Sequence, residues 1–142
     1  MNCIDTHAHV FSVQDHSIET ARYTPNYDAS VQGFISHLDE HKFTHGVLVQ
    51  PSFLGTNNQT MLNAIQQYPE RLKGIAVVQH TTAFDELVQL KEQGIVGVRL
   101  NLFGLNPPTL NTPEWQMFLR NVESLNWQVE VHAPPKYLVQ LL

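Results

Sequence analysis

The chain has 142 residues, of which 42% are apolar and 15% are charged, and its formal charge is -5 at pH 7. This composition predicts one globular domain with a sizeable core and argues against a nucleic-acid surface, which needs a basic stripe. No apolar run approaches the ~18 residues that span a bilayer, and the single cysteine, Cys3, excludes an internal disulfide. We therefore predict a soluble, cytoplasmic protein with no nucleic-acid or membrane partner.

Strand and helix signals alternate along the whole chain. Short apolar runs bounded by turn residues predict five strands, at 2–11, 46–51, 74–78, 95–101 and 127–133. Apolar residues at helical spacing predict helices at 31–43, 59–68, from a cap at Thr81 or Thr82 to 93, from a cap at Thr112, and from 135 onward. Asp28 or Ser30 is expected to cap the first helix. A polar, aromatic loop, 12–27, precedes that helix, and loops of this length are often functional.

This alternation predicts a parallel sheet, either an open doubly wound sheet or a (β/α)8 barrel. Polar groups share one face of three strands and gather toward their carboxyl ends, namely Asp5, His7 and His9, then Arg99 and Asn101, then Glu130 and His132. A doubly wound sheet buries both faces, whereas the inner face of a barrel opens into an active-site mouth. We therefore predict the α/β class and a TIM-barrel-like fold, here a partial barrel of five parallel strands in a single domain, 1–142.

Three histidines and one arginine are the candidates for chemistry. His7 and His9 can grip a divalent metal or aim two donors at one oxygen, and a solvated surface pair is the alternative. Arg99 is suited to anchoring a carboxylate, and a salt-bridged strand end is its alternative. His132 is either a functional partner of these groups or a buried histidine bonded to a neighbour.

Four stretches together resemble the amidohydrolase-2 family. They read I-D-T-H-A-H-V-F from Ile4, R-Y-T-P-x-Y-D-A from Arg22, G-V-L-V-Q-P-S from Gly46 and G-V-R-L-N-L from Gly97. The resemblance covers essentially the whole chain and is nearest to a branch of lactonases that act on dicarboxylic acids. It implies a distorted TIM barrel with the active site at the carboxyl ends of the strands.

The resemblance also implies roles for individual residues. His7, His9 and His132 match positions that bind one or two divalent metals in the broader superfamily, whereas the lactonase branch uses them without a metal as hydrogen-bonding groups. Arg99 matches a substrate arginine, and Ser52, Tyr23 and Asn101 are the expected polar contacts to substrate. The expected activity is opening of a lactone of a dicarboxylic acid by water, with no cofactor and a small acidic substrate. A zinc-dependent hydrolase or non-oxidative decarboxylase is the alternative.

One departure from the family concerns the later strands. The chain matches the first five strand-helix units, so a sixth-strand histidine and an eighth-strand aspartate, the expected general base, have no counterpart. We therefore expect a truncated product, or a chain whose open barrel is covered by a second copy or a complementing chain. An inactive half-barrel that serves only for association is the third alternative.

Overall fold

The structure, a computed structural model, describes residues 3–141, so Asn2 and Leu142, which begin and end the predicted elements, lie outside the described residues. The strands are β1 (Ile4–Ala8), β2 (His45–Val49), β3 (Leu72–Ala76), β4 (Ile95–Asn101) and β5 (Gln128–His132). The helices are α1 (Val31–Glu40), α2 (Gln59–Gln67), α3 (Phe84–Glu92), α4 (Pro113–Ser124) and α5 (Pro135–Leu141), with one 3-10 turn, η1 (Ser52–Leu54). In this part of the chain no helix is both long and apolar enough to cross a membrane.

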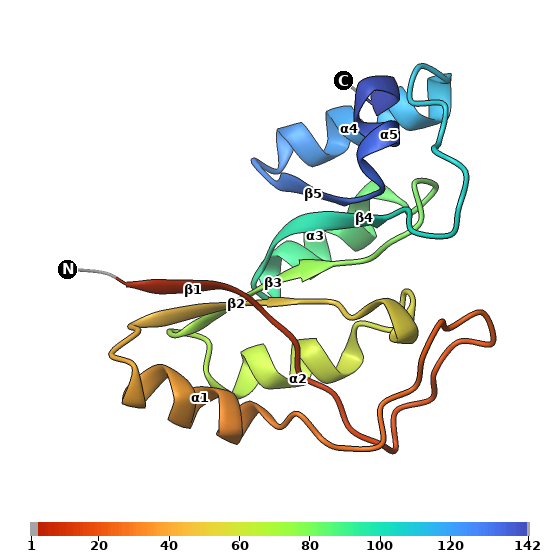
Figure 1. Cartoon of the computed structure of the whole chain (residues 1–142). Helices are drawn as coiled ribbons and strands as arrows, with labels where there is room; N and C mark the ends of the chain where they lie inside the picture. The colour runs from red at the N-terminus through yellow and green to blue at the C-terminus, as the bar shows by residue number, and fades with distance from the viewer. Residues whose placement is uncertain (1–2, 142) are drawn as a thin grey trace.

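All strand pairs are parallel, and the order in the sheet is β1-β2-β3-β4-β5, the order in the sequence. A doubly wound sheet reverses its order at a switch point, whereas a barrel adds each strand beside the last. The sheet turns through space as it proceeds, and the helices follow its outer side (Figure 1). The prediction of a partial TIM barrel with five parallel strands is confirmed.

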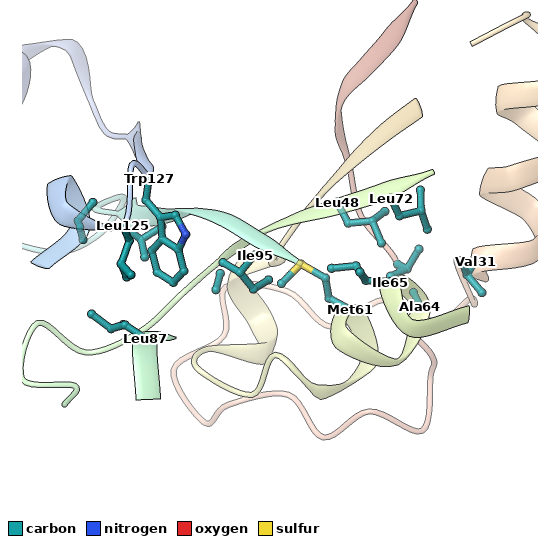
Figure 2. Close-up of a cluster of buried hydrophobic side chains, with 14 of the residues drawn as sticks. Val31, Leu48, Met61, Ala64, Ile65, Leu72, Leu87, Ile95, Leu125 and Trp127 are labelled. Carbon is teal, nitrogen blue, oxygen red and sulfur yellow. The ribbon is translucent and has the colours of Figure 1, made fainter. Parts of the chain in front are cut away.

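The core lies between the helices and the outer face of the sheet. Leu48 and Leu72 of the strands are fully buried, as is Leu87 of α3. Figure 2 shows Met61 and Ile65 of α2 beside Ile95 of β4, and Trp127 beside Leu125 in the part nearest α4. Because one face of every strand is committed to this apolar layer, the polar residues that alternate with it are directed to the inner face.

The first strand contains an irregularity that changes which side chains share a face. Asp5 pairs with Gly46 and Ala8 with Leu48, so β1 has one residue more than β2 between these pairs. Such a bulge shifts the alternation by one residue. Asp5 therefore faces outward, where its carboxylate lies 3.8 Å from His37 of α1, while Ala8 packs into the core. The prediction that Asp5 shares the face of His7 and His9 is wrong for this reason.

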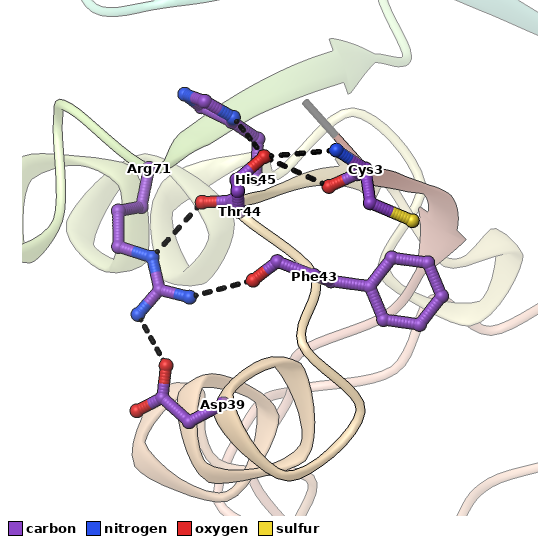
Figure 3. Close-up of polar contacts among 6 residues, drawn as sticks. All are labelled: Cys3, Asp39, Phe43, Thr44, His45 and Arg71. Atoms are coloured by element: carbon purple, nitrogen blue, oxygen red, sulfur yellow. Dashed lines mark hydrogen bonds and ion pairs between the residues drawn. The ribbon is translucent and has the colours of Figure 1, made fainter. Parts of the chain in front are cut away.

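The amino ends of the first strands are held by Arg71 (Figure 3). Its guanidinium donates to the carbonyl oxygens of Phe43 and Thr44, both at 3.1 Å, and to the Asp39 carboxylate at 2.7 Å. Thr44 Oγ1 in turn accepts from the backbone N–H of Cys3 at 3.1 Å. These contacts fix the entry of β1 and β2 at the end of the sheet away from the polar inner-face residues.

Several predicted boundaries shift for identifiable reasons. β3 ends at Ala76, not at 78, because the Asn58 side chain forms both backbone hydrogen bonds of Val77. It accepts from the Val77 N–H at 3.1 Å and donates to the Val77 carbonyl at 2.9 Å. Ser30, and not Asp28, caps α1 through Gly33 N–H. Neither Thr81 nor Thr82 caps α3, which begins after Ala83 without a side-chain cap. The predicted Thr112 cap of α4 is confirmed.

We expect Gly97→Ala to destabilise the fold by about 1–3 kcal/mol, as overpacking does. A Cβ there would lie 2.6 Å from the Gln128 carbonyl oxygen and 2.9 Å from the Ile75 side chain, and the Gln128 contact is with backbone. Urea unfolding measures the loss. Gly33→Ala is the matched control, since its nearest neighbour is the Ser30 hydroxyl at 3.3 Å; an equal loss in both variants would contradict the packing argument.

Candidate active site

The inner face of β4 and β5 carries two polar pairs set side by side by the strand register. Arg99 pairs with Glu130, and Asn101 pairs with His132. His132 Nδ1 lies 3.1 Å from Asn101 Oδ1, which orients the imidazole ring. The alternation along two parallel strands therefore brings four of the polar side chains toward one region of the barrel interior.

Arg99 is buried, with 7% of its surface exposed. Its Nη1 donates to the Gln50 carbonyl at 3.2 Å. Its Nε lies 3.1 Å from Glu130 Oε1, although the N–H is not aligned for a hydrogen bond. Burial lowers the pKa of Arg99 from its usual value, and the Glu130 carboxylate acts in the opposite direction. The charged guanidinium is thus held by two other parts of the sheet, the Gln50 carbonyl just after β2 and the Glu130 carboxylate on β5.

Glu130 also reaches the first strand. Its Oε2 lies 3.4 Å from His7 Nδ1, so one carboxylate stands between Arg99 of β4 and His7 of β1. The rings of His7 and His9 meet edge to face, with centroids 5.1 Å apart. The predicted histidines of β1 and the polar face of β5 are therefore brought together, with Glu130 as the link.

The hydrogen bond of His9 defines its tautomer. Nδ1 lies 2.7 Å from the Val49 carbonyl oxygen, which can only accept, so Nδ1 carries the proton and Nε2 is free to accept when the ring is neutral. Burial lowers the pKa of His9; the hydrogen bond to Val49 opposes this effect, and the charge of Arg99 adds to it. Burial likewise lowers the pKa of His132, followed by the charges of Arg99 and Arg22. Both rings are therefore neutral in the folded chain at neutral pH.

A cavity of about 460 Å³ opens beside the carboxyl ends of the strands. Two predicted substrate contacts line it, Ser52 from η1 and Asn101 from β4, together with Arg22 and Phe103. The Ser52 turn is held by the buried Gln50 side chain, whose Nε2 donates to the carbonyls of Gly55 and Asn57 at 3.1 and 2.7 Å.

Tyr23, the third predicted polar contact, does not line this cavity. It is 54% exposed, and its ring packs edge to face on Phe53. A larger cavity, of about 540 Å³, lies against α2 and the end of α3 on the outer side of the sheet. His7, His9, Arg99 and His132 line neither cavity. The larger cavity also lacks Ser52 and Asn101, so the smaller one is the candidate substrate cavity.

Three residues at the site were not assigned a role from the sequence. Glu130 shares the inner face with His132, so strand alternation was the signal that could have identified it. Arg22 lies in one of the stretches that carry the family resemblance, next to Tyr23. Phe103 lies after β4, and its ring packs on His132 with centroids 4.5 Å apart; no sequence signal pointed to it.

The histidines do not form a metal-binding group in this arrangement. Within residues 3–141, no three His, Cys, Asp or Glu side chains are placed so that they could hold a metal ion. His7 Nδ1 faces a carboxylate and His132 Nδ1 faces an amide oxygen. Zinc as a cofactor remains a prediction for this protein.

Comparison with known proteins places these observations in context. The model of the family described as "Amidohydrolase" matches residues 4–141. A 4-sulfomuconolactone hydrolase from Rhizobium radiobacter is 30% identical over 141 residues, which cover 94% of this chain and 46% of that protein. The chain thus spans about half the length of the curated relatives it matches.

Solved structures agree with this comparison. A probable 2-pyrone-4,6-dicarboxylic acid hydrolase from Acinetobacter baumannii with citric acid bound is 87% identical, with a TM-score of 0.98 over 99% of this chain and 53% of that one. A putative hydrolase of the same name from Pseudomonas putida is 41% identical, with a TM-score of 0.82 over 92% of this chain and 48% of that one. A zinc-bound amidohydrolase from Burkholderia multivorans, 10% identical with a TM-score of 0.74 over 99% of this chain and 52% of that one, shares the fold alone.

The lowered pKa values of His9 and His132 predict how stability depends on pH. Below 6.5 the unfolded chain binds protons that the folded chain does not, so the free energy of unfolding falls as the pH drops through 6.5 toward the folded pKa values. His9→Asn removes one of the two groups and keeps a donor for Val49, so the fall should become shallower. Urea midpoints between about pH 8 and pH 5 measure it; identical slopes in variant and wild type would contradict this assignment.

Proposed function

The chain belongs to the amidohydrolase family, and we propose that it supplies part of the active site of a hydrolase that opens the lactone ring of a dicarboxylic acid. The observation that carries this proposal is the convergence of His7, His9 and His132 with the buried cation of Arg99 on one inner face. The names of the relatives at 87%, 41% and 30% identity support a lactone as the substrate class. The candidate substrate is 2-pyrone-4,6-dicarboxylate.

The geometry assigns different parts of the reaction to different histidines. His9 presents an unprotonated Nε2, because its Nδ1–H is given to Val49, and it is therefore suited to accept a hydrogen bond from the attacking water. His7 faces the Glu130 carboxylate, which can balance the charge of a protonated ring. The Nε2–H of that ring can then donate to the oxyanion that forms at the lactone carbonyl.

Arg99 is proposed to bind one substrate carboxylate. A guanidinium has five N–H donors, and among the described residues only Gln50 accepts a hydrogen bond from it, through Nη1. The remaining donors, in a site of low dielectric, can bind a carboxylate in the bidentate manner that arginine favours. Ser52 and Asn101 at the cavity wall are the proposed neutral contacts, and Tyr23 is a proposed contact from the exposed loop.

The partners predicted from the sequence remain part of the proposal. Among the described residues, β1 and β5 each pair with one neighbour only. The edge strands carry apolar side chains that are partly exposed, with Ile4 at 48%, Val129 at 37% and Val131 at 38%. A second copy or a complementing chain that covers these edges is the predicted partner, and a cytoplasmic location stays a prediction.

The role of Arg99 is tested by Arg99→Gln in the full-length protein as its gene encodes it. We expect kcat/KM for 2-pyrone-4,6-dicarboxylate to fall by roughly 100-fold, the loss of a charge-assisted contact in a buried site. Arg120→Gln is the matched control, since Arg120 is exposed on α4 and outside the site. If the two variants lose the same activity, the assignment of Arg99 is wrong. Circular dichroism checks that Arg99→Gln is folded, because the change leaves Glu130 with one partner fewer.

The metal-free alternative is tested by elemental analysis of protein purified without a histidine tag. We expect hydrolysis to persist after dialysis against a chelator, because no three His, Cys, Asp or Glu side chains of the described residues group as metal ligands. Stoichiometric zinc that is lost in His7→Asn, together with loss of activity on chelation, would overturn this expectation and favour the zinc-dependent hydrolase or decarboxylase.

A further inference from the structure

Arg22 is a second arginine near Arg99. It lies in the segment that connects β1 to α1 and lines the 460 Å³ cavity together with Ser52 and Asn101. Its Cζ lies 5.4 Å from the centroid of the Phe103 ring. A cation over an aromatic face at this separation is attracted to the ring, which favours one placement of an otherwise long and mobile side chain.

Phe103 connects this cation to the catalytic end of the strands. One of its contacts is with Arg22, and another is with His132, whose ring centroid is 4.5 Å away. His132 in turn is bonded to Asn101, a wall of the same cavity. Arg22 is therefore placed by packing at the wall of this cavity, although it comes from a segment more than 70 residues earlier than Phe103.

The charges around Arg22 do not compensate it. Across residues 3–141, no carboxylate lies within ion-pair distance of its guanidinium, whereas Glu130 is already shared by Arg99 and His7. Arg22 lies close enough to Arg99 and His132 for its charge to act on both. Two guanidinium groups at one site with a single shared carboxylate leave positive charge that an anion can neutralise.

We propose that Arg22 binds the second carboxylate of the substrate, so that Arg22 and Arg99 together select a dianionic lactone over a monoanionic one. This inference rests on the proposed function. A ligand with two carboxylates across a planar ring would meet Arg99 on the inner face of the sheet and Arg22 at the wall of the adjoining cavity. The alternative is that Arg22 has no role in binding and is a loop residue held by its contact with Phe103.

The first test compares Arg22→Gln, Arg22→Lys and the control Arg120→Gln in the full-length protein. For 2-pyrone-4,6-dicarboxylate we expect Arg22→Gln to raise KM by roughly 10- to 100-fold with kcat changed by less than about 2-fold. Arg22→Lys should raise KM less, because lysine keeps the positive charge, although it lacks the planar fork of donors. For a 2-pyrone monocarboxylate that retains only the carboxylate bound by Arg99, Arg22→Gln should match wild type. Equal losses on both substrates, or no loss on either, would overturn the role of Arg22.

The second test separates this inference from the proposed function. Calorimetry measures binding of isophthalate, a ring dicarboxylate that cannot be hydrolysed, and of benzoate, its monoanionic counterpart. We expect Arg22→Gln to weaken the binding of isophthalate by roughly 10-fold or more and to leave the binding of benzoate unchanged. That result supports carboxylate binding by Arg22 even if the pyrone is not hydrolysed. In that case only the proposed function fails. If hydrolysis is found while isophthalate binds Arg22→Gln and Arg120→Gln equally, the role of Arg22 fails alone.

Discussion

A buried guanidinium has to be compensated by the protein, and the compensation of Arg99 organises the inner face of this sheet. Its partners come from different places in the fold, the Gln50 carbonyl just after β2 and the Glu130 carboxylate on β5. Glu130 extends the connection to His7 on β1. Leaving such a charge unpaired is strongly destabilising, so these strands are constrained to a curvature that keeps the groups in reach. The curvature of the half-barrel and the pairing of charges in its site therefore depend on each other.

The same arrangement separates two kinds of chemistry within a small volume. Permanent cations, Arg99 and Arg22, stand beside imidazoles whose pKa values are lowered, mainly by burial, in His9 and His132. Neutral rings provide acceptor nitrogens, while the guanidiniums provide anchoring for anions. A chain with a net charge of -5 thereby concentrates positive charge at one end of its strands. The proposed hydrolysis of an acidic lactone needs this contrast, since the site would have to attract an anion and also orient water.

Much of the architecture could be predicted because its signals are local. β4 has the predicted bounds, as does the capped start of α4 at Thr112 and Pro113, since hydrophobic alternation and capping residues act within a few positions of sequence. The errors arose where a distant group competed with the local pattern. The Asn58 side chain hydrogen-bonds to both backbone groups of Val77 and thereby shortens β3. An extra residue in β1 rotated Asp5 to the outer face.

The repeating strand and helix units, the family resemblance, and the candidates His7, His9, Arg99 and His132 could be read from the chain alone, because periodicity and motif spacing are properties of neighbouring residues. Which of these groups meet depends on the folded arrangement. That Glu130 stands between Arg99 and His7, and that Arg22 reaches the cavity over Phe103, depends on how far the sheet curves and where a long loop returns. Such distances are set by the packing of the whole outer layer of helices, which no local pattern encodes.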